Sequence, residues 1–424
     1  MERREFLQAG TGAAAGLLLL NTKAAFGYQA NSAVRHGLLG CGNRGTAVAT
    51  SFSRNTTAQV VAVADLFDDQ LAAGKAHFDQ VNASLGRAAI DEKMVFKGPH
   101  AFEELANAQG VDLIQISTPP FFHVQHLETA VASGKHVYCE KPVGIDIKQA
   151  KHALEIATRV KPAQSVDVGF QCRSAPPIAA LAEKIKAGGL GKVAVVSGWY
   201  FAPASKEHPH SQGKSKDEYR LRNWLWDRAL SGDILVEQNI HIIDLCNWML
   251  GAKPEKATAR GGRNVLTHAG DCWDNYEVVF TYPGDVRMAF TSTQFGVDGV
   301  FDAGLRLFGA NGMATAPYSG PVEIKGNQPW KWEESAGTST GSGQFAANGA
   351  FLDNLKYADR DKERTFIESI TGGQPHNQIA AGVETALSCM LGRMAGLTGR
   401  EVTWEQLLEH GENYKLGFSV DEFA

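Results

Sequence analysis

Short apolar runs alternate with longer amphipathic stretches over the first third of the chain. The runs cover residues 34–39, 58–64, 111–117 and 135–139, and apolar residues recur at helical spacing between them. Strands that alternate with helices predict a doubly wound parallel sheet with helices on both faces. Because ligands of such sheets bind beyond the carboxyl ends of the strands, we expect the residues that follow these runs to form a site.

The second half of the chain has a different pattern. A strand is predicted at 192–201, and residues 275–281 and 286–294 flank the turn sequence Tyr-Pro-Gly-Asp, which predicts a hairpin. A long helix with Ala and Leu on one side is predicted at 379–397. We therefore expect two α/β domains, at 31–160 and 161–424, and we allow for the C-terminal helices packing back on the first domain.

The first apolar run ends in the glycine-rich turn Gly40-x-Gly42-x-x-Gly45. Glycine permits the dihedral angles of a tight turn and lets a pyrophosphate approach the backbone, and the next helix directs its amides at the phosphates. Asp65 ends the second run, 25 residues after Gly40, where a carboxylate can accept from the ribose hydroxyls and disfavours a 2′-phosphate. The pattern favours NAD, although Arg44 in the turn could contact a phosphate, and an ordinary strand–helix turn is the alternative.

Composition narrows the classes of function. The chain has 424 residues, of which 44% are hydrophobic and 21% are charged, and its formal net charge is −5. Since Lys and Arg form no cluster, we expect neither nucleic acid nor an anionic membrane as a partner. The six cysteines show no CxxC spacing and are expected to be small buried side chains. The polar triplet of Glu207, His208 and His210 is not expected to bind a metal.

The N-terminus resembles a twin-arginine export signal. Arg3 and Arg4 precede Phe6 and an apolar run at 9–20, which is too short to span a membrane. We exclude residues 1–30 from the fold and expect a periplasmic or secreted protein without a membrane anchor; a frayed N-terminal helix is the alternative. Because this route exports folded proteins, an enzyme that uses it would do best to hold its NAD tightly and regenerate it within the catalytic cycle.

A lysine at the end of the fourth run is a candidate for chemistry. Lys141 lies within Glu140-Lys141-Pro142, directly after the run at 135–139. A lysine at a strand end, beside a nicotinamide, can donate to a substrate oxygen, and Pro142 restricts the backbone so that the side chain is aimed. The alternative is a surface lysine in a salt bridge.

A second candidate lies in the segment 232–248. Helical spacing places Glu237, His241 and Asp244 on one face of one predicted helix. A histidine can take and return a proton near neutral pH, and a carboxylate one turn away could set its tautomer. The alternative is a core histidine bonded to a backbone carbonyl. Upstream, Trp224 could stack on a sugar ring or pack in the core.

These motifs together resemble the Gfo/Idh/MocA family of NAD(P)-dependent oxidoreductases. The resemblance rests on the Gly40 turn, Asp65, Thr118-Pro119 followed by His123, and Glu140-Lys141-Pro142, and it covers nearly all of the mature chain. It implies a Rossmann domain followed by an α/β domain built on a large, mostly antiparallel sheet. It also implies a homo-oligomer, a dimer or a tetramer, formed through the open face of that sheet.

The resemblance assigns roles to individual residues. His241 is the implied acid/base, and Glu237 stands where the family more often has Asp. The expected catalytic residues are Lys141, His241 and Glu237. The expected contacts of NAD are Gly40, Gly42, Asn43, Arg44, Gly45, Asp65, Ser117, Thr118, Pro119, His123, Glu140 and Lys141. The expected substrate contacts are Arg173, Trp224, Asn239 and His241.

The sequence therefore predicts an exported NAD-dependent oxidoreductase acting on a sugar, polyol or glycoside hydroxyl. A glycoside hydrolase or lyase that oxidises its substrate transiently is the alternative, although the tyrosine motif expected of such enzymes is not evident around 237–241. A non-catalytic sugar or nucleotide sensor is a third possibility, which the presence of both Lys141 and His241 disfavours.

Overall fold

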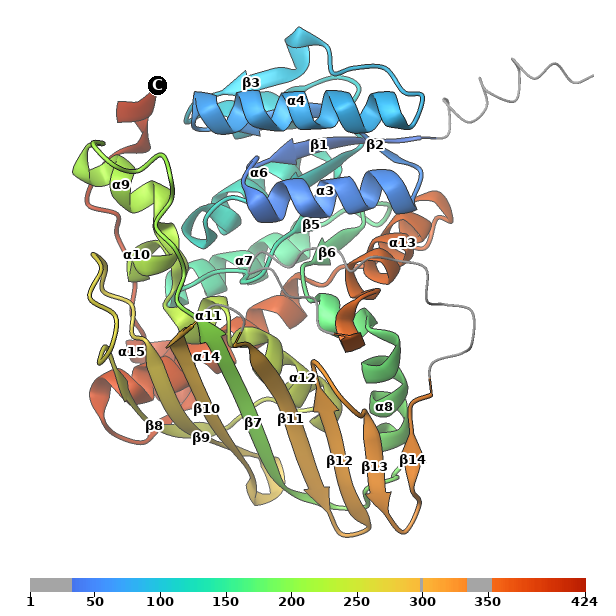
Figure 1. Cartoon of the computed structure of the whole chain (residues 1–424), viewed down its shortest axis with the longest axis vertical. Helices are drawn as coiled ribbons and strands as arrows, with labels where there is room; N and C mark the ends of the chain where they lie inside the picture. The colour runs from blue at the N-terminus through green and yellow to red at the C-terminus, as the bar shows by residue number, and fades with distance from the viewer. Residues whose placement is uncertain (1–32, 298–299, 334–352) are drawn as a thin grey trace, which may run out of the picture.

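The computed structural model describes residues 33–297, 300–333 and 353–424, so the predicted export signal lies outside the described residues. Six parallel strands form the sheet of the first domain, in the order β3-β2-β1-β4-β5-β6 (Figure 1). Their bounds are β1 Val34–Leu39, β2 Ala58–Asp65, β3 Val95–Lys97, β4 Leu113–Ile116, β5 His136–Cys139 and β6 Val166–Val168. The expected doubly wound parallel sheet is confirmed.

The register of the strands places the candidate residues on one edge. Leu39 pairs with Ala64 and with Ile116, and Ile116 pairs with Cys139. The residues that come directly after these paired positions, among them Asp65 and Glu140, are therefore neighbours at the carboxyl edge. The strand order reverses between β1 and β4, and this switch point is where open α/β sheets bind ligands.

Helices cover both faces of this sheet because each has one apolar side. Buried residues of α3 (Asn43–Asn55) and α4 (Asp68–Ser84) pack on one face. Those of α5 (Ala101–Asn107), α6 (His123–Ser133) and α7 (Ile147–Arg159) pack on the other.

Nine strands form the sheet of the second domain, in the order β14-β13-β12-β11-β7-β10-β9-β8-β15. Only β10 and β7 pair in parallel, so the sheet is mostly antiparallel, as expected. The predicted hairpin is confirmed, with Val286 paired to Tyr282. The bounds are β7 Val193–Pro203, β8 Lys256–Gly262, β9 Asn275–Tyr282, β10 Val286–Gly296, β11 Asp302–Gly309, β12 Gly312–Pro317, β13 Glu323–Gly326, β14 Trp330–Lys331 and β15 Val402–Thr403.

Helices lie on one face of this second sheet, and its other face is open (Figure 1). The buried sides of α8 (Pro176–Lys186), α12 (Ile240–Leu250) and α14 (Ile379–Thr398) pack on the sheet, and α15 (Trp404–His410) follows. Short helices α9 (Lys216–Arg222), α10 (Arg228–Ser231) and α11 (Ile234–Glu237) connect β7 to α12. None of the helices in the described residues is long and apolar enough to cross a membrane.

The C-terminal part of the chain returns to the first domain. On α13 (Ala358–Thr371), the ring centroid of Phe366 lies 6.2 Å from those of Phe52 and Tyr138. The chain then runs beside β6, where the Val166 amide donates to the His376 carbonyl over 2.7 Å. The Rossmann core is therefore completed by residues distant in sequence.

This packing predicts the effect of removing the Phe366 ring. Phe366→Ala should lower the free energy of unfolding by about 3–5 kcal/mol, because it leaves a cavity among fully buried rings. Urea denaturation followed by tryptophan fluorescence measures the change. Val265→Ala, at a side chain that is 52% exposed, is the control and should shift the midpoint little. Equal midpoints for the two variants would contradict the packing described for α13.

Candidate active site

The glycine turn has the shape that a pyrophosphate needs. Gly40 has a φ of +93°, and a Cβ there would lie 2.6 Å from the Ser117 carbonyl oxygen. A Cβ on Gly45 would collide with the Gly40 carbonyl, whereas one on Gly42 would meet nothing within 4 Å. No side chain caps α3, so its first-turn amides have no side-chain acceptor. These features fit the phosphates of a dinucleotide.

Asp65 holds this turn and has the chemistry of a ribose acceptor. Its Oδ2 accepts from the Cys41 amide over 2.7 Å, and its Oδ1 accepts from the Phe67 amide over 2.9 Å. Burial raises the pKa of Asp65, while these amide bonds favour its ionised form. A carboxylate so placed fits the ribose hydroxyls of NAD and repels a 2′-phosphate.

Arg44 is committed to other partners. Its Nε donates to Glu140 over 2.9 Å, and its Nη1 and Nη2 donate to Asp359 of α13 over 2.7 and 2.9 Å. The guanidinium is therefore neutralised within the protein, and a 2′-phosphate would have to compete with two carboxylates for it. Arg44 joins the glycine turn to the end of β5 and to the C-terminal part of the chain.

Lys141 and Glu237 form the contact at the centre of the site. The Lys141 Nζ donates to the Glu237 Oε1 and to the Glu237 carbonyl oxygen, each over 2.5 Å. Their side chains are only 12% and 10% exposed. Lys141 follows β5 of the first domain, and Glu237 ends α11 of the second, so the contact lies where the two domains meet.

His123 connects two strand ends beside this contact. Its Nδ1 lies 2.8 Å from the Pro142 carbonyl oxygen, and its Nε2 lies 2.7 Å from the Thr118 carbonyl oxygen. Burial lowers the pKa of His123, and a neutral ring can donate to only one of the two at a time. The ring therefore positions the turn that carries Lys141.

His241 lies in the first turn of α12 and is 8% exposed. Burial, with Lys141 and Arg44 nearby, holds the pKa of His241 well below its usual range. The neutral imidazole can therefore accept a proton. Within the described part of the chain, the His241 Nδ1 and both amide atoms of Asn239 are buried without a partner. Such groups cost about 1–3 kcal/mol each when left unpaired, so this cluster is built to meet a polar ligand or water.

The single helix predicted for Glu237, His241 and Asp244 is wrong. The chain breaks into α11 and α12, because the amides of Gln238 and Asn239 both donate to the Ile234 carbonyl, each over 3.0 Å. Glu237 is bound by Lys141 and therefore does not set the tautomer of His241. The break turns Glu237 toward the first domain.

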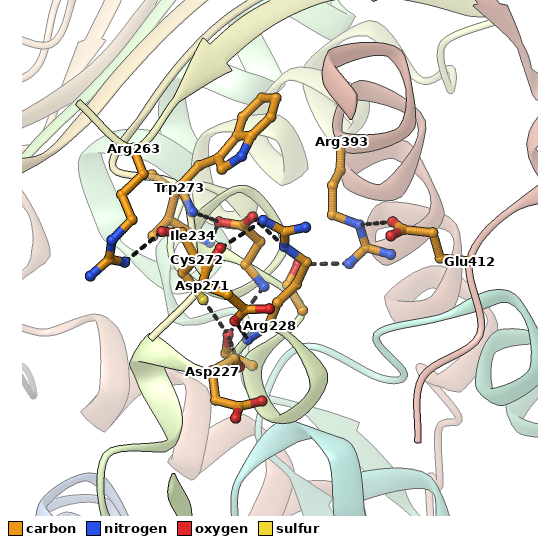
Figure 2. A network of polar contacts seen from close by, with 12 residues as sticks. Asp227, Arg228, Ile234, Arg263, Asp271, Cys272, Trp273, Arg393 and Glu412 are labelled. Atoms are coloured by element: carbon orange, nitrogen blue, oxygen red, sulfur yellow. Dashed lines mark hydrogen bonds and ion pairs between the residues drawn. The ribbon is translucent and has the colours of Figure 1, made fainter. Parts of the chain in front are cut away.

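A buried arginine, Arg393, supports both halves of the site, and Figure 2 shows its guanidinium bonded to Glu412. Arg393 of α14 is 1% exposed. Its Nη1 donates to the Gly232 carbonyl over 2.6 Å, its Nη2 to the Ile145 carbonyl over 3.0 Å, and its Nε to Glu412 over 3.0 Å. Gly232 lies just before α11, and Ile145 lies just after the turn that carries Lys141. One rigid guanidinium therefore sets the spacing of the two segments.

Asp233 supports the start of α11 in the same network. Its φ is +77°, and its Oδ1 accepts from the amides of Ile234 and Trp273 over 2.7 and 3.1 Å. Its Oδ2 accepts from the Arg228 Nε and the Tyr276 hydroxyl, each over 3.1 Å. An unusual backbone conformation held by four donors fixes where α11 begins.

Comparison with known proteins agrees with this geometry. The model "Oxidoreductase family, NAD-binding Rossmann fold" matches residues 34–168, and the model "GFO/IDH/MocA C-terminal domain" matches residues 178–315. Together they span more than half of the chain.

The chain belongs to the Gfo/Idh/MocA oxidoreductase family. Its cofactor is NAD, and the expected class of NAD-dependent oxidoreductase is confirmed.

Individual relatives in the family are distant. An inositol 2-dehydrogenase of Rhizobium meliloti is 25% identical over 294 residues, which cover 69% of this chain and 78% of the relative. A glycosyl hydrolase family 109 protein of Solibacter usitatus is 31% identical over 153 residues, 35% of this chain and 34% of that protein. A solved levoglucosan dehydrogenase with NADH and levoglucosan has the same fold, with a TM-score of 0.68, 15% identity, and coverage of 88% of this chain and 100% of that one.

The structure gathers most of the residues singled out from the sequence. The carboxyl edge of the Rossmann sheet carries Gly40, Gly42, Asn43, Arg44, Gly45, Asp65, Ser117, Thr118, Pro119, Glu140 and Lys141. Two of the residues expected to contact the substrate have partners within the protein. Arg173 donates to Asp244 from its Nε and Nη2 over 2.7 and 2.5 Å, and Trp224 packs in an apolar cluster with Phe122. The described residues contain no group that could hold a metal ion.

Sequence reasoning missed the supporting residues Asp233, Asp359 and Arg393. Arg393 had a signal, because it is a lone arginine within the apolar part of the predicted helix at 379–397. A buried arginine needs several hydrogen-bond acceptors, which are often backbone carbonyl groups of loops near a functional site. Asp233 and Asp359 had no comparable signal.

The role of Arg393 can be tested by a charge-preserving change. Arg393→Lys keeps the charge, but its compact ammonium group lacks the planar fork that reaches three separated acceptors, so kcat should fall about 10- to 100-fold as Lys141 and Glu237 lose their spacing. KM and NAD affinity should change less, and Arg400→Lys, at an exposed residue, is the control. A lower melting temperature with unchanged kcat would mean that Arg393 contributes stability alone.

The state of His241 predicts a pH profile. Since the folded pKa of His241 lies well below 6.5, kcat/KM for alcohol oxidation should stay level as the pH falls through 6.5 and drop only at more acidic pH. Initial rates between about pH 5 and 9 test this. The same shift makes the protein less stable below pH 6.5, because the unfolded state then binds more protons. An acidic limb centred above 6.5 would exclude His241 as the base.

Proposed function

We propose that this protein is an exported NAD-dependent oxidoreductase that oxidises a hydroxyl group of an uncharged sugar, polyol or glycoside. The observation that carries the proposal is the Lys141–Glu237 contact at the same sheet edge as the glycine turn and Asp65. A neutral His241 lies close enough for Lys141 to lower its pKa. NAD, when bound, supplies the hydride acceptor.

The hydrogen bonds of Lys141 suggest its role. An ammonium group has three donors, and two of them are used by the Oε1 and the carbonyl of Glu237. The third is left for the oxygen of the substrate. His241 accepts the proton of that hydroxyl as the C–H bond breaks, and the hydrogen bond from Lys141 stabilises the charge that develops on the oxygen.

The charges around the site favour an uncharged substrate. Among the described residues that border it, Lys141 is paired with Glu237, Arg44 with Glu140 and Asp359, and Arg173 with Asp244. A sugar acid would find no cation without a carboxylate partner there. The amide of Asn239 can bond to hydroxyl groups. The inositol and levoglucosan dehydrogenases among the similar proteins agree with a polyol or sugar substrate.

A redox-neutral glycoside hydrolase or lyase is the second candidate. Oxidation of a sugar hydroxyl acidifies the neighbouring C–H, which allows the aglycone to be eliminated before the hydride is returned. The glycosyl hydrolase family 109 relative supports this possibility over about a third of the chain.

Two further parts of the proposal rest on the sequence and the family. Export would use Arg3 and Arg4, and cell fractionation of a strain producing the full chain tests it.

Association as a dimer or tetramer would use the open sheet face, where Val195, Val279 and Phe308 are about two-fifths exposed. Light scattering of the purified protein measures the oligomeric state.

A substrate panel tests the proposal. Denatured protein should release NAD(H), and uncharged sugars or glycosides should react at least about 10-fold faster than the corresponding sugar acids. Lys141→Met should lower kcat about 10²- to 10³-fold. Lys325→Met, an exposed lysine of β13, is the matched control. Nitrophenol release without net NADH formation would select the redox-neutral reaction, and a preference for sugar acids would contradict the charge argument.

A further inference from the structure

Two segments of the second domain cover the end of the Rossmann sheet beside Asp65. The first is the loop–helix segment, residues 203–222, which follows β7 and includes α9. The second is the tail, residues 411–424, which ends beside α9 (Figure 1). Both contact residues 66–69, which continue directly from the ribose acceptor Asp65.

Asp69 fastens the loop–helix segment to the Rossmann domain. Its carboxylate accepts from the Arg222 Nη1 and Nη2 over 2.9 and 3.1 Å and from the His210 Nδ1 over 2.5 Å. The Arg222 side chain is 5% exposed, and its guanidinium lies 4.0 Å from the centre of the Phe67 ring. A shielded bidentate pair is stronger than an ordinary surface salt bridge.

The tail crosses the carboxyl side of the sheet. It starts near α7, where the Tyr414 amide donates to Asp146 over 2.9 Å. It then passes α9, where the Arg220 Nη1 donates to the Leu416 carbonyl over 2.8 Å. It reaches the end of β2, where the ring centroid of Phe423 lies 6.0 Å from that of Phe67. The tail thus extends from near the β5 end to the β2 end of the binding edge.

One apolar cluster joins these parts. Phe122, Leu221 and Leu230 are buried in it, and the partly buried side chains are Leu66, Phe67, Phe121, Trp224, Leu416, Phe418, Val420 and Phe423. The Rossmann members follow β2 and β4. A pocket of about 530 Å³, open to solvent, is lined by residues 66–69, Lys97, the loop–helix segment and the end of the tail. In a Rossmann domain, the adenosine lies at this end of the sheet, because its ribose bonds to the acid that ends β2.

We propose that the loop–helix segment and the tail form a cover over the adenosine half of NAD, so that NAD stays bound through successive catalytic cycles. The inference rests on the proposed function, since it assumes that the ribose of NAD lies at Asp65. Release would require Asp69 to part from Arg222 and the Phe423 ring to leave Phe67.

A retained cofactor determines the class of overall reaction. The hydride taken from one hydroxyl must leave the reduced cofactor in the same site. It is transferred either back to the same sugar or to the carbonyl carbon of a second substrate, which takes up a proton and becomes an alcohol. In both cases the free NAD pool is not reduced.

The rate of NADH release tests the cover. Full-length protein loaded with NADH is mixed with excess NAD, and the loss of bound-NADH fluorescence gives the dissociation rate. Arg222→Gln and Phe423→Ala should each speed release at least about 10-fold, and less NAD(H) should remain bound after purification. Arg400→Gln and Val265→Ala, at exposed positions outside the loop–helix segment and the tail, are the controls and should release NADH like the native protein.

The possible outcomes distinguish a failure of the proposed cover from a failure of the proposed function. Phe423 is only partly buried, so Phe423→Ala tests the cover even if Arg222→Gln fails to fold. If the native protein binds NADH but releases it no more slowly than either cover variant, the proposed cover is wrong and the proposed oxidoreductase function is unaffected. Native protein that binds no NAD or NADH would instead overturn the proposed function, and the cover with it.

Discussion

The contact between Lys141 and Glu237 is the interaction on which the rest of the site depends. It joins the end of β5 to the end of α11, and it uses two of the three donors of Lys141. Several features of the fold keep these residues together. His123 holds the turn after β5, Asp233 starts α11, and Arg393 bonds to the backbone beside both. The geometry of one polar pair is thus maintained by buried groups from three segments.

Buried charges in this protein are paired across distant parts of the chain. Arg44 in the glycine turn bonds to Glu140 and to Asp359, and Arg173 bonds to Asp244. Unpaired, each would carry a large desolvation cost. When paired, Arg44 connects the carboxyl edge of the Rossmann sheet to α13, and Arg173 and Asp244 neutralise each other within the second domain. The same pattern recurs at Asp69 and Arg222, which join the loop–helix segment to the residues that follow β2.

Errors of sequence reasoning occurred where tertiary contacts outweighed local periodicity. The spacing of Glu237, His241 and Asp244 fits one helix, yet the chain breaks at 238–239 so that Glu237 reaches Lys141. Asp244 lies on α12 and pairs with Arg173 rather than with His241. Periodicity reports which side of a helix is apolar, but it does not report which partner a charged side chain will find.

The sequence by itself determined the Rossmann sheet, the glycine turn, the acid at the end of β2 and the lysine at the end of β5. These features follow from local rules, because strand periodicity and backbone freedom at glycine act over a few residues. Only the tertiary structure decided which groups support Lys141, why Arg44 is not free for a phosphate, and that the tail reaches Phe67. These contacts join residues separated by hundreds of positions, and their partners are selected by packing and charge pairing in the folded chain.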